Sequence, residues 1–497
     1  MDATQPETPL RSTASTRSCI QSPLSPLMTY PELKAPMALS PDLQHSSIKP
    51  LDQLRRWRIQ IFAVTWLVYF ALYFTRQAFS TAKVGILDDP SMSAMTEPLM
   101  GVLDATYLTA YAVGQFVWGT LADRFGPRRV LLVGLTVSAA SAALMGFTTA
   151  IIGFGLLMVA QGLAQSSGWA PLCKNMSAFF AVSERGRVFG WWTTNYALGG
   201  LVAGPFAGWW AYSVFHNWRA AFISTAAVVA LVLVITAVAQ RDTPKAVGLG
   251  DVDIDDWASR RKGQQKSQGV ADSVQVVEGP DESVVGDANQ AEVGILRGIR
   301  DSFLVAVRDR MVLRLGLAYF LLKPSRYAIL LWGPIIVLKR APQVTDLEAV
   351  IVPVTFGVGG VLGPILIGWA SDRLFQSRRI PATVISVVIL AVASAAFVPL
   401  TSTGDIAMIA IILGLIGLSM YAADSVLSAT AAVDFGTKEH AGAAVGFVNG
   451  SGSVGAILGG LIPGFVGPEA LFYSFAALAL LTGVLLLPSW RLRAATA

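Results

Sequence analysis

The chain alternates long apolar segments with short polar ones. From about residue 58 onward, the apolar segments have roughly the 20 residues that a helix needs to cross a bilayer. A longer polar stretch at 241–311 divides them into two sets. The pattern predicts twelve transmembrane helices, six in each set, at 58–82, 99–121, 129–147, 150–173, 187–212, 219–240, 312–338, 348–371, 381–400, 405–432, 440–465 and 469–489.

The composition agrees with an all-α polytopic membrane protein. Of 497 residues, 54% are hydrophobic and 14% are charged, whereas soluble domains carry about 25% charged residues. The two cysteines, Cys19 and Cys173, fit neither a disulfide scaffold nor a metal site. The sequence has no nucleotide-binding motif and no nucleophile paired with a base. We therefore expect a monomer in the lipid bilayer that is not an enzyme, has no cofactor and binds no nucleic acid.

Five regions are expected along the chain. Residues 1–54 are rich in Ser, Thr and Pro and predict a disordered N-terminal extension. Two six-helix bundles follow, at 55–240 and 312–490. They are joined by a central loop at 241–311 and followed by a tail at 491–497.

Cations indicate the orientation of the chain. Loops on one side hold most of them, whereas Lys83, Arg219, Lys339 and Arg340 are the few expected on the other side. The positive-inside rule then places both termini and the central loop in the cytoplasm. The inner membrane of a bacterium is the expected location.

A repeated loop motif relates the two sets of segments. Gly119-Thr-Leu-Ala-Asp123-Arg124-Phe-Gly-Pro-Arg128-Arg129 follows the second segment, and Gly368-Trp-Ala-Ser-Asp372-Arg373-Leu-Phe-Gln-Ser-Arg378-Arg379 follows the eighth. Repeats of half a transporter are typical of alternating-access carriers. We expect Asp123, Arg124, Asp372 and Arg373 to act in gating at the cytoplasmic helix ends.

Two arginines lie inside apolar segments at matching places in the halves. They are Arg76 and Arg326, about 250 residues apart. An arginine at the centre of a membrane helix costs at least about 2.5 kcal/mol, so such residues usually line a cavity or a substrate path. The pair predicts a basic cavity between the halves and an anionic substrate. Tyr69 and Tyr73 share a helical face with Arg76.

The loop motifs resemble the signature of the major facilitator superfamily. Within it, the chain resembles the organophosphate:phosphate antiporters from about residue 55 to the C-terminus. The stretches that carry this resemblance are Tyr69-x3-Tyr73-Phe-Thr-Arg76-x2-Phe79, Gln161-Gly-Leu-Ala-Gln165-Ser-Ser-Gly168-Trp169-Ala-Pro171 and Arg326-Tyr-Ala-Ile-Leu-Leu-Trp332-Gly-Pro334.

The resemblance implies two pseudo-symmetric six-helix bundles with the site between them. It also implies transport of a phosphorylated organic anion, of the sugar phosphate or glycerol phosphate type, in exchange for inorganic phosphate. Arg76 and Arg326 would grip the phosphate, and Tyr69 and Tyr73 would line the same cavity.

The chain departs from the glycerol-phosphate carriers at four positions. It has Gln115 where they have a lysine, Tyr196 for a histidine, Gly357 for a glutamate, and Asp424 for an apolar residue. We expect Gln115 and Tyr196 to remain substrate contacts. Two further expected contacts are Asn449 and Lys323, which lies one turn before Arg326.

Asp424 leaves three roles open. It could be a proton-coupling acid, a partner for Arg326 or Lys323 in the empty carrier, or a packing residue. The first role corresponds to an alternative function, proton-coupled symport of another organic anion. A second alternative is a transporter-like hexose-phosphate sensor.

Overall fold

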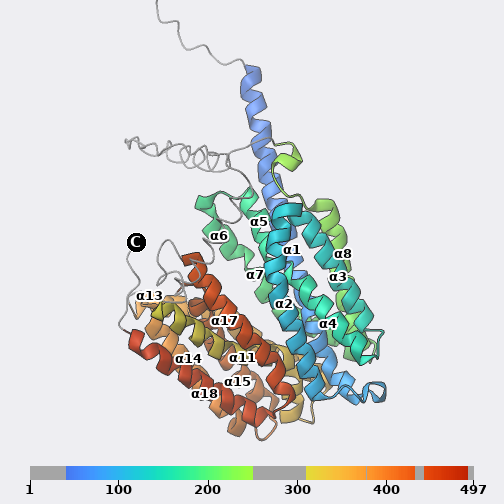
Figure 1. Ribbon diagram of the computed structural model, residues 1–497, viewed down its shortest axis with the longest axis vertical. Coiled ribbons are helices and arrows are strands. Elements are labelled where there is room, and N and C mark those ends of the chain that lie inside the picture. Colours follow the sequence, from blue (N-terminus) through green and yellow to red (C-terminus); the bar gives the residue numbers. More distant parts are fainter. Residues whose placement is uncertain (1–40, 250–308, 376–377, 431–440, 491–497) are drawn as a thin grey trace, which may run out of the picture. The chain divides into compact units, whose positions relative to one another are not determined.

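The computed structural model describes residues 41–249, 309–375, 378–430 and 441–490 (Figure 1). The chain divides into two units, residues 1–51 and 52–497. The first unit contributes only the first turns of α1 (Pro41–Asp88) to the described part. The expected tail at 491–497 and most of the central loop lie outside the described residues.

The N-terminal part of the second unit is a set of packed helices (Figure 1). α2 packs against α4, and α3 packs against both α4 and α8. Their bounds are α1 (Pro41–Asp88), α2 (Glu97–Phe125), α3 (Pro127–Met145), α4 (Ile151–Ser166), α5 (Trp169–Phe179), α6 (Val182–Trp192), α7 (Thr194–Gly208), the π-helix η2 (Trp209–Val214) and α8 (Arg219–Ala239).

The C-terminal part repeats this organisation. α11 packs along α17, α13 along α15, and α14 along α18, as Figure 1 shows for α14 and α18. The bounds are α11 (Arg310–Arg340), α12 (Asp346–Ile351), α13 (Val354–Arg373), α14 (Arg379–Leu400), α15 (Ile406–Ser425), the π-helix η4 (Val426–Thr430), α17 (Ala441–Leu461) and α18 (Pro468–Leu486).

The all-α fold class is as expected. In the described part, nine helical stretches are long and apolar enough to cross a membrane. The expected segments at 99–121, 187–212 and 440–465 coincide with α2, with α6 and α7, and with α17. The count of twelve spans and the domain boundaries remain predictions.

Local helix ends differ from the expected segments. α1 begins at Pro41, inside the stretch expected to be disordered. Extending an established helix backward is cheaper than nucleating a new one, and proline suits the first helical position.

The expected segment 150–173 is interrupted between α4 and α5. At that break, a Cβ on Gly168 would lie 2.7 Å from Leu72 Cδ1, so α1 comes very close to the backbone there.

The two halves touch through glycine backbones at the predicted outer side. A Cβ on Gly101 of α2 would lie 2.6 Å from the carbonyl oxygen of Leu461, where α17 ends. A Cβ on Gly464 would lie 2.6 Å from the carbonyl oxygen of Glu97. Small residues allow such close helix contact in membranes. This contact holds α2 against the end of α17.

Lys83 corrects the sequence analysis, which places it among the outer loop cations. Its side chain is completely buried, with Nζ 2.5 Å from Asp104 Oδ2 in α2. Nζ also donates to the carbonyl oxygen of Leu331 in α11 at 2.9 Å and lies 3.8 Å from the Trp332 ring centroid. Trp332 Nε1 in turn donates to the Gly460 carbonyl of α17. One buried ion pair therefore connects helices of both halves.

The first prediction concerns this buried pair. Lys83→Met should lower the thermal stability of the detergent-purified protein strongly, because it leaves the Asp104 carboxylate buried without a cation. Removing one partner of a buried pair costs about 3–5 kcal/mol. The double variant Lys83→Met with Asp104→Asn should be more stable than Lys83→Met alone.

A neighbouring neutral contact provides the control. Ser80 in α1 donates to the Leu330 carbonyl of α11 at 3.2 Å, and losing such a bond costs about 1 kcal/mol. Ser80→Ala should therefore shift the unfolding temperature much less. A Lys83→Met protein as stable as the wild type would contradict the prediction.

Candidate functional site

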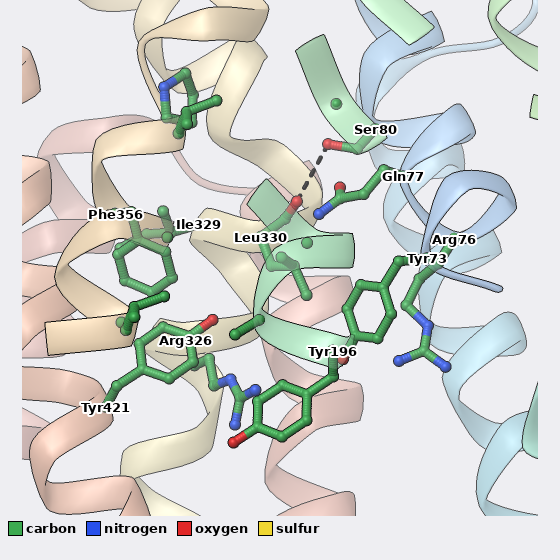
Figure 2. A pocket seen from close by; sticks show the side chains of 18 of the residues that line it. Tyr73, Arg76, Gln77, Ser80, Tyr196, Arg326, Ile329, Leu330, Phe356 and Tyr421 are labelled. Atoms are coloured by element: carbon green, nitrogen blue, oxygen red, sulfur yellow. Dashed lines mark hydrogen bonds between the residues drawn. The ribbon is translucent and has the colours of Figure 1, made fainter. Parts of the chain in front are cut away.

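A cavity of about 360 Å³ lies among α1, α7, α11, α13 and α15. Its size falls in the range of roughly 300–1,000 Å³ that is typical of small-molecule sites. Tyr73 and Arg76 line it from α1, Tyr196 from α7, Arg326 from α11 and Tyr421 from α15. In the view of Figure 2, Tyr73 and Tyr196 lie between the two arginines. Both arginines expected from the sequence thus border one cavity.

Arg76 is held by neutral partners. Its Nε donates to Gln165 Oε1 at 2.9 Å, and the hydroxyl of Tyr107 donates to the same oxygen at 2.8 Å. Gln165 is completely buried, and its Nε2 donates to the hydroxyl of Thr75 at 3.0 Å. The Arg76 guanidinium also lies over the rings of Tyr73 and Tyr111, at 4.6 and 5.0 Å. These contacts orient the guanidinium without neutralising its charge.

The Arg76 guanidinium retains binding capacity. Its Nη2 is buried and has no hydrogen-bond partner among the described residues. Within the same part of the chain, no carboxylate forms an ion pair with it. A buried donor without an acceptor is costly. An anion in the cavity would satisfy both this donor and the charge.

Arg326 differs because it has a carboxylate partner. Its Nη1 donates to Asp424 Oδ2 at 2.9 Å, and Lys323 Nζ lies 3.1 Å from Asp424 Oδ1. The guanidinium lies over the Tyr421 ring, 4.4 Å from its centroid. Its Nε is buried without a partner in the described structure. Arg326 therefore has a counter-ion and still has a free donor.

The site has a surplus of positive charge. Arg76, Arg326 and Lys323 contribute three cations, and Asp424 is the carboxylate that pairs with two of them. The surplus is two positive charges. Guanidinium groups bind phosphate oxygens through two parallel hydrogen bonds. The arrangement suits a dianion with several oxygens.

The other expected site residues are placed differently. Of the residues that the structure describes there, Tyr69, Gln115, Lys323, Asp424 and Asn449 are not among those that line the cavity. Tyr69 packs on the rings of Tyr73, Trp169 and Trp192. The side chains of Gln115 and Asn449 are exposed, and Asn449 Nδ2 donates to the Ser428 carbonyl. Their substrate contacts remain predictions.

The expected gating residues lie at helix ends. Asp123, with an exposed side chain, pairs with Lys174 of α5 at 2.6 Å. Arg124 and Arg373 are also exposed, over the rings of Phe125 and Trp369. The side chain of Asp372 lies outside the described residues. The Asp123 pair lies within the N-terminal half and joins α2 to α5.

Several site residues are missing from the sequence analysis. Gln165, Tyr107 and Tyr111 surround Arg76, and Tyr421 covers Arg326. A signal was available for the α2 tyrosines, because they are four residues apart and share one helical face. Tyr421 likewise lies three residues before Asp424. Their partners come from other helices, so spacing alone does not identify them.

Comparisons with known proteins agree with the family and the fold. The model of the Major Facilitator Superfamily matches residues 65–455 and also 315–496. A probable hexose phosphate transport protein of Chlamydia trachomatis serovar D is 25% identical over 446 residues, covering 88% of this chain and 92% of the relative. The membrane sensor protein UhpC of Escherichia coli (strain K12) is 29% identical over 411 residues, covering 82% and 85%.

A solved structure shares the fold. It is a bacterial homologue of the human lysosomal transporter Spinster, in an inward-facing and unoccupied conformation. Its TM-score is 0.62 at 15% sequence identity, and the match covers 87% of this chain and 95% of that one. At this identity the likeness concerns the fold alone.

The second prediction tests how Arg76 is held. Gln165→Leu removes the acceptor that orients Arg76 Nε and should weaken binding of inorganic phosphate to the purified protein about tenfold. Hydrogen bonds to charged groups contribute about 1.5–3 kcal/mol, and 1.4 kcal/mol corresponds to tenfold in affinity. Isothermal titration calorimetry gives the affinity.

Gln161 is a matched control on the same helix. It is buried and bonded to Ser138 and Ser141 rather than to the arginine. Gln161→Leu should lower stability and leave phosphate affinity unchanged. Equal losses of affinity in both variants would show that Gln165 has no specific role.

Proposed function

The chain belongs to the Major Facilitator Superfamily, and on this premise we propose that it exchanges a phosphorylated organic anion for inorganic phosphate. The superfamily and the transporter fold confirm what the sequence motifs predict. The relatives named above include a hexose phosphate transport protein. We therefore propose a sugar phosphate or a related phosphate ester as the organic substrate.

One observation supports this proposal above all. Arg76 and Arg326 occupy corresponding places in the two halves and border one cavity, and Arg76 has no carboxylate partner in the described structure. A phosphate monoester dianion would neutralise the surplus charge and provide acceptors for both free guanidinium donors. We propose that Arg76 and Arg326 bind the phosphate, with Tyr73 and Tyr196 beside them.

The charge surplus favours exchange. If the carrier changes conformation while empty, its surplus charge is enclosed between the halves without a counter-ion, in a membrane interior where charge is poorly solvated. A bound anion removes this cost in both directions. Inorganic phosphate on the return step would then serve as well as the organic phosphate.

The distribution of cations along the chain supports a location for the protein, and its two halves support a way in which it would move. The protein is an integral membrane protein, and we propose the bacterial inner membrane with both termini in the cytoplasm. The halves at 55–240 and 312–490 would move relative to each other around the cavity. The contact of Lys83 with the Leu331 carbonyl and the approach of Gly101 to the Leu461 carbonyl would then close the outer side.

The 29% sequence identity to a membrane sensor protein supports a second candidate function. A sensor would bind a hexose phosphate in the same cavity and transport little of it. Reconstituted liposomes separate the two functions, because a sensor would show ligand binding without appreciable flux.

The third prediction concerns the arginine fork. Arg76→Lys keeps the charge but loses the planar pair of donors, so phosphate exchange in liposomes should fall by roughly tenfold or more while membrane insertion is unchanged. Arg326→Lys should behave similarly. Wild-type flux in Arg76→Lys would contradict the role of this residue in binding.

The fourth prediction concerns coupling. Loading liposomes with inorganic phosphate should stimulate uptake of labelled glucose 6-phosphate, and collapsing a proton gradient should change it little. Uptake that needs the proton gradient and ignores internal phosphate would instead support proton-coupled symport through Asp424. Empty liposomes with the same gradient serve as the control.

A further inference from the structure

Asp424 bridges two cations that have different access to the cavity. One carboxylate oxygen lies 2.9 Å from Arg326 Nη1, and the other lies 3.1 Å from Lys323 Nζ. Arg326 lines the cavity, whereas Lys323 and Asp424 are not among the described residues that line it. The carboxylate therefore lies behind Arg326, with Lys323 on its other side.

Lys323 is fixed in this position by packing. A Cβ on Gly452 would lie 3.2 Å from Lys323 Cγ, and a Cβ on Gly455 would lie 3.2 Å from Lys323 Cβ, so α17 rests on the lysine stem. The ammonium group lies 4.5 Å from the centroid of the Tyr319 ring. Movement of Lys323 toward a ligand would disturb all of these contacts. Its ion-pair partner in this structure is Asp424.

We propose that Lys323 is a positioning residue that holds the Asp424 carboxylate when Arg326 turns from Asp424 to the substrate phosphate. In the empty site, Asp424 stands in for the phosphate at Arg326. On binding, the Arg326–Asp424 ion pair is exchanged for an Arg326–phosphate pair, and the Lys323–Asp424 pair persists. Lys323 thus acts through Asp424 and does not contact the substrate.

The charges balance in the bound state. Arg76 and Arg326 carry two positive charges opposite a phosphate dianion, while Lys323 and Asp424 form a neutral pair behind them. Without Lys323, Asp424 would remain on Arg326 and repel the phosphate. Without both Lys323 and Asp424, the two arginines would again face the dianion alone. The difference between losing Lys323 alone and losing both residues therefore tests the inference.

The fifth prediction is a double-variant experiment on the reconstituted full chain. Lys323→Met keeps most of the stem volume against α17 and should raise the KM for glucose 6-phosphate exchange about tenfold or more, with a smaller change in maximal rate. Adding Asp424→Asn to Lys323→Met should restore the KM to within about threefold of the wild type. Direct binding of inorganic phosphate by calorimetry should follow the same pattern.

Lys245 provides a charge control. It is exposed in the short helix Lys245–Val247 after α8, so Lys245→Met removes one cation outside the site. Its KM should equal that of the wild type. Thermal unfolding of each variant shows whether a change in KM follows from loss of structure. A rescued KM in the double variant cannot arise from general destabilisation.

The outcomes separate this inference from the proposed function on which it rests. If wild-type protein exchanges phosphate esters but the double variant keeps the high KM of Lys323→Met, Lys323 contacts the substrate itself and the inference fails. An unchanged KM in Lys323→Met also overturns it. If the wild type neither binds nor exchanges any phosphate ester, the proposed function fails first, and the inference fails with it.

Discussion

Charge in a medium that cannot solvate it is the constraint on which this structure depends. An unpaired ion inside a membrane costs at least about 2.5 kcal/mol, and more where water and headgroups cannot reach it. The chain nevertheless places several ionised side chains within its helices. Each of them requires a partner from the protein, or else a ligand. The ion pairs that the described residues form determine part of the packing. The lack of a carboxylate for Arg76 among those residues determines the character of the site.

Three arrangements illustrate this constraint. Lys83 and Asp104 neutralise each other in a fully buried pair. Arg326 and Lys323 share the carboxylate of Asp424. Arg76 has the amide of Gln165 and two tyrosine rings, but no carboxylate among the described residues. The first arrangement joins α1 and α2 to α11 of the other half, and the other two leave the charge surplus that a dianion would neutralise.

The sequence identifies charges in apolar surroundings but not their partners. Arg76 and Arg326 stand out because an arginine is rare in a segment long enough to cross a membrane. Asp104 gives the same signal inside the expected segment 99–121, yet its partner Lys83 lies beyond the expected end of the preceding segment at 82. The pairing depends on how α1 and α2 pack, which a one-dimensional pattern does not contain.

Other differences between the sequence expectations and the structure also arise from tertiary packing. At the break between α4 and α5, side chains of α1 come close to Gly168, and the hydrophobic pattern does not contain this tertiary contact. Gln115 and Asn449 enter the expected site by resemblance or position along a helix, and neither is among the residues that border the cavity. The all-α class follows from hydrophobic segment length alone.

The relative size of two energies explains how such a carrier can be both mobile and coupled. Lys83 and Asp104 belong to the same half, so opening the outer side would keep their ion pair. Of the contacts that Lys83 makes, the bond to the Leu331 carbonyl and the contact with the Trp332 ring would break. A hydrogen bond from a charged group contributes about 1.5–3 kcal/mol, and a desolvated cation–π contact about 2 kcal/mol. Water that enters the opened side replaces part of these interactions of the Lys83 ammonium group. The surplus charge of the empty site has no such replacement while both sides are closed. Switching is therefore less costly when an anion occupies the site than when the site is empty, and this difference is what would make the carrier exchange one anion for another.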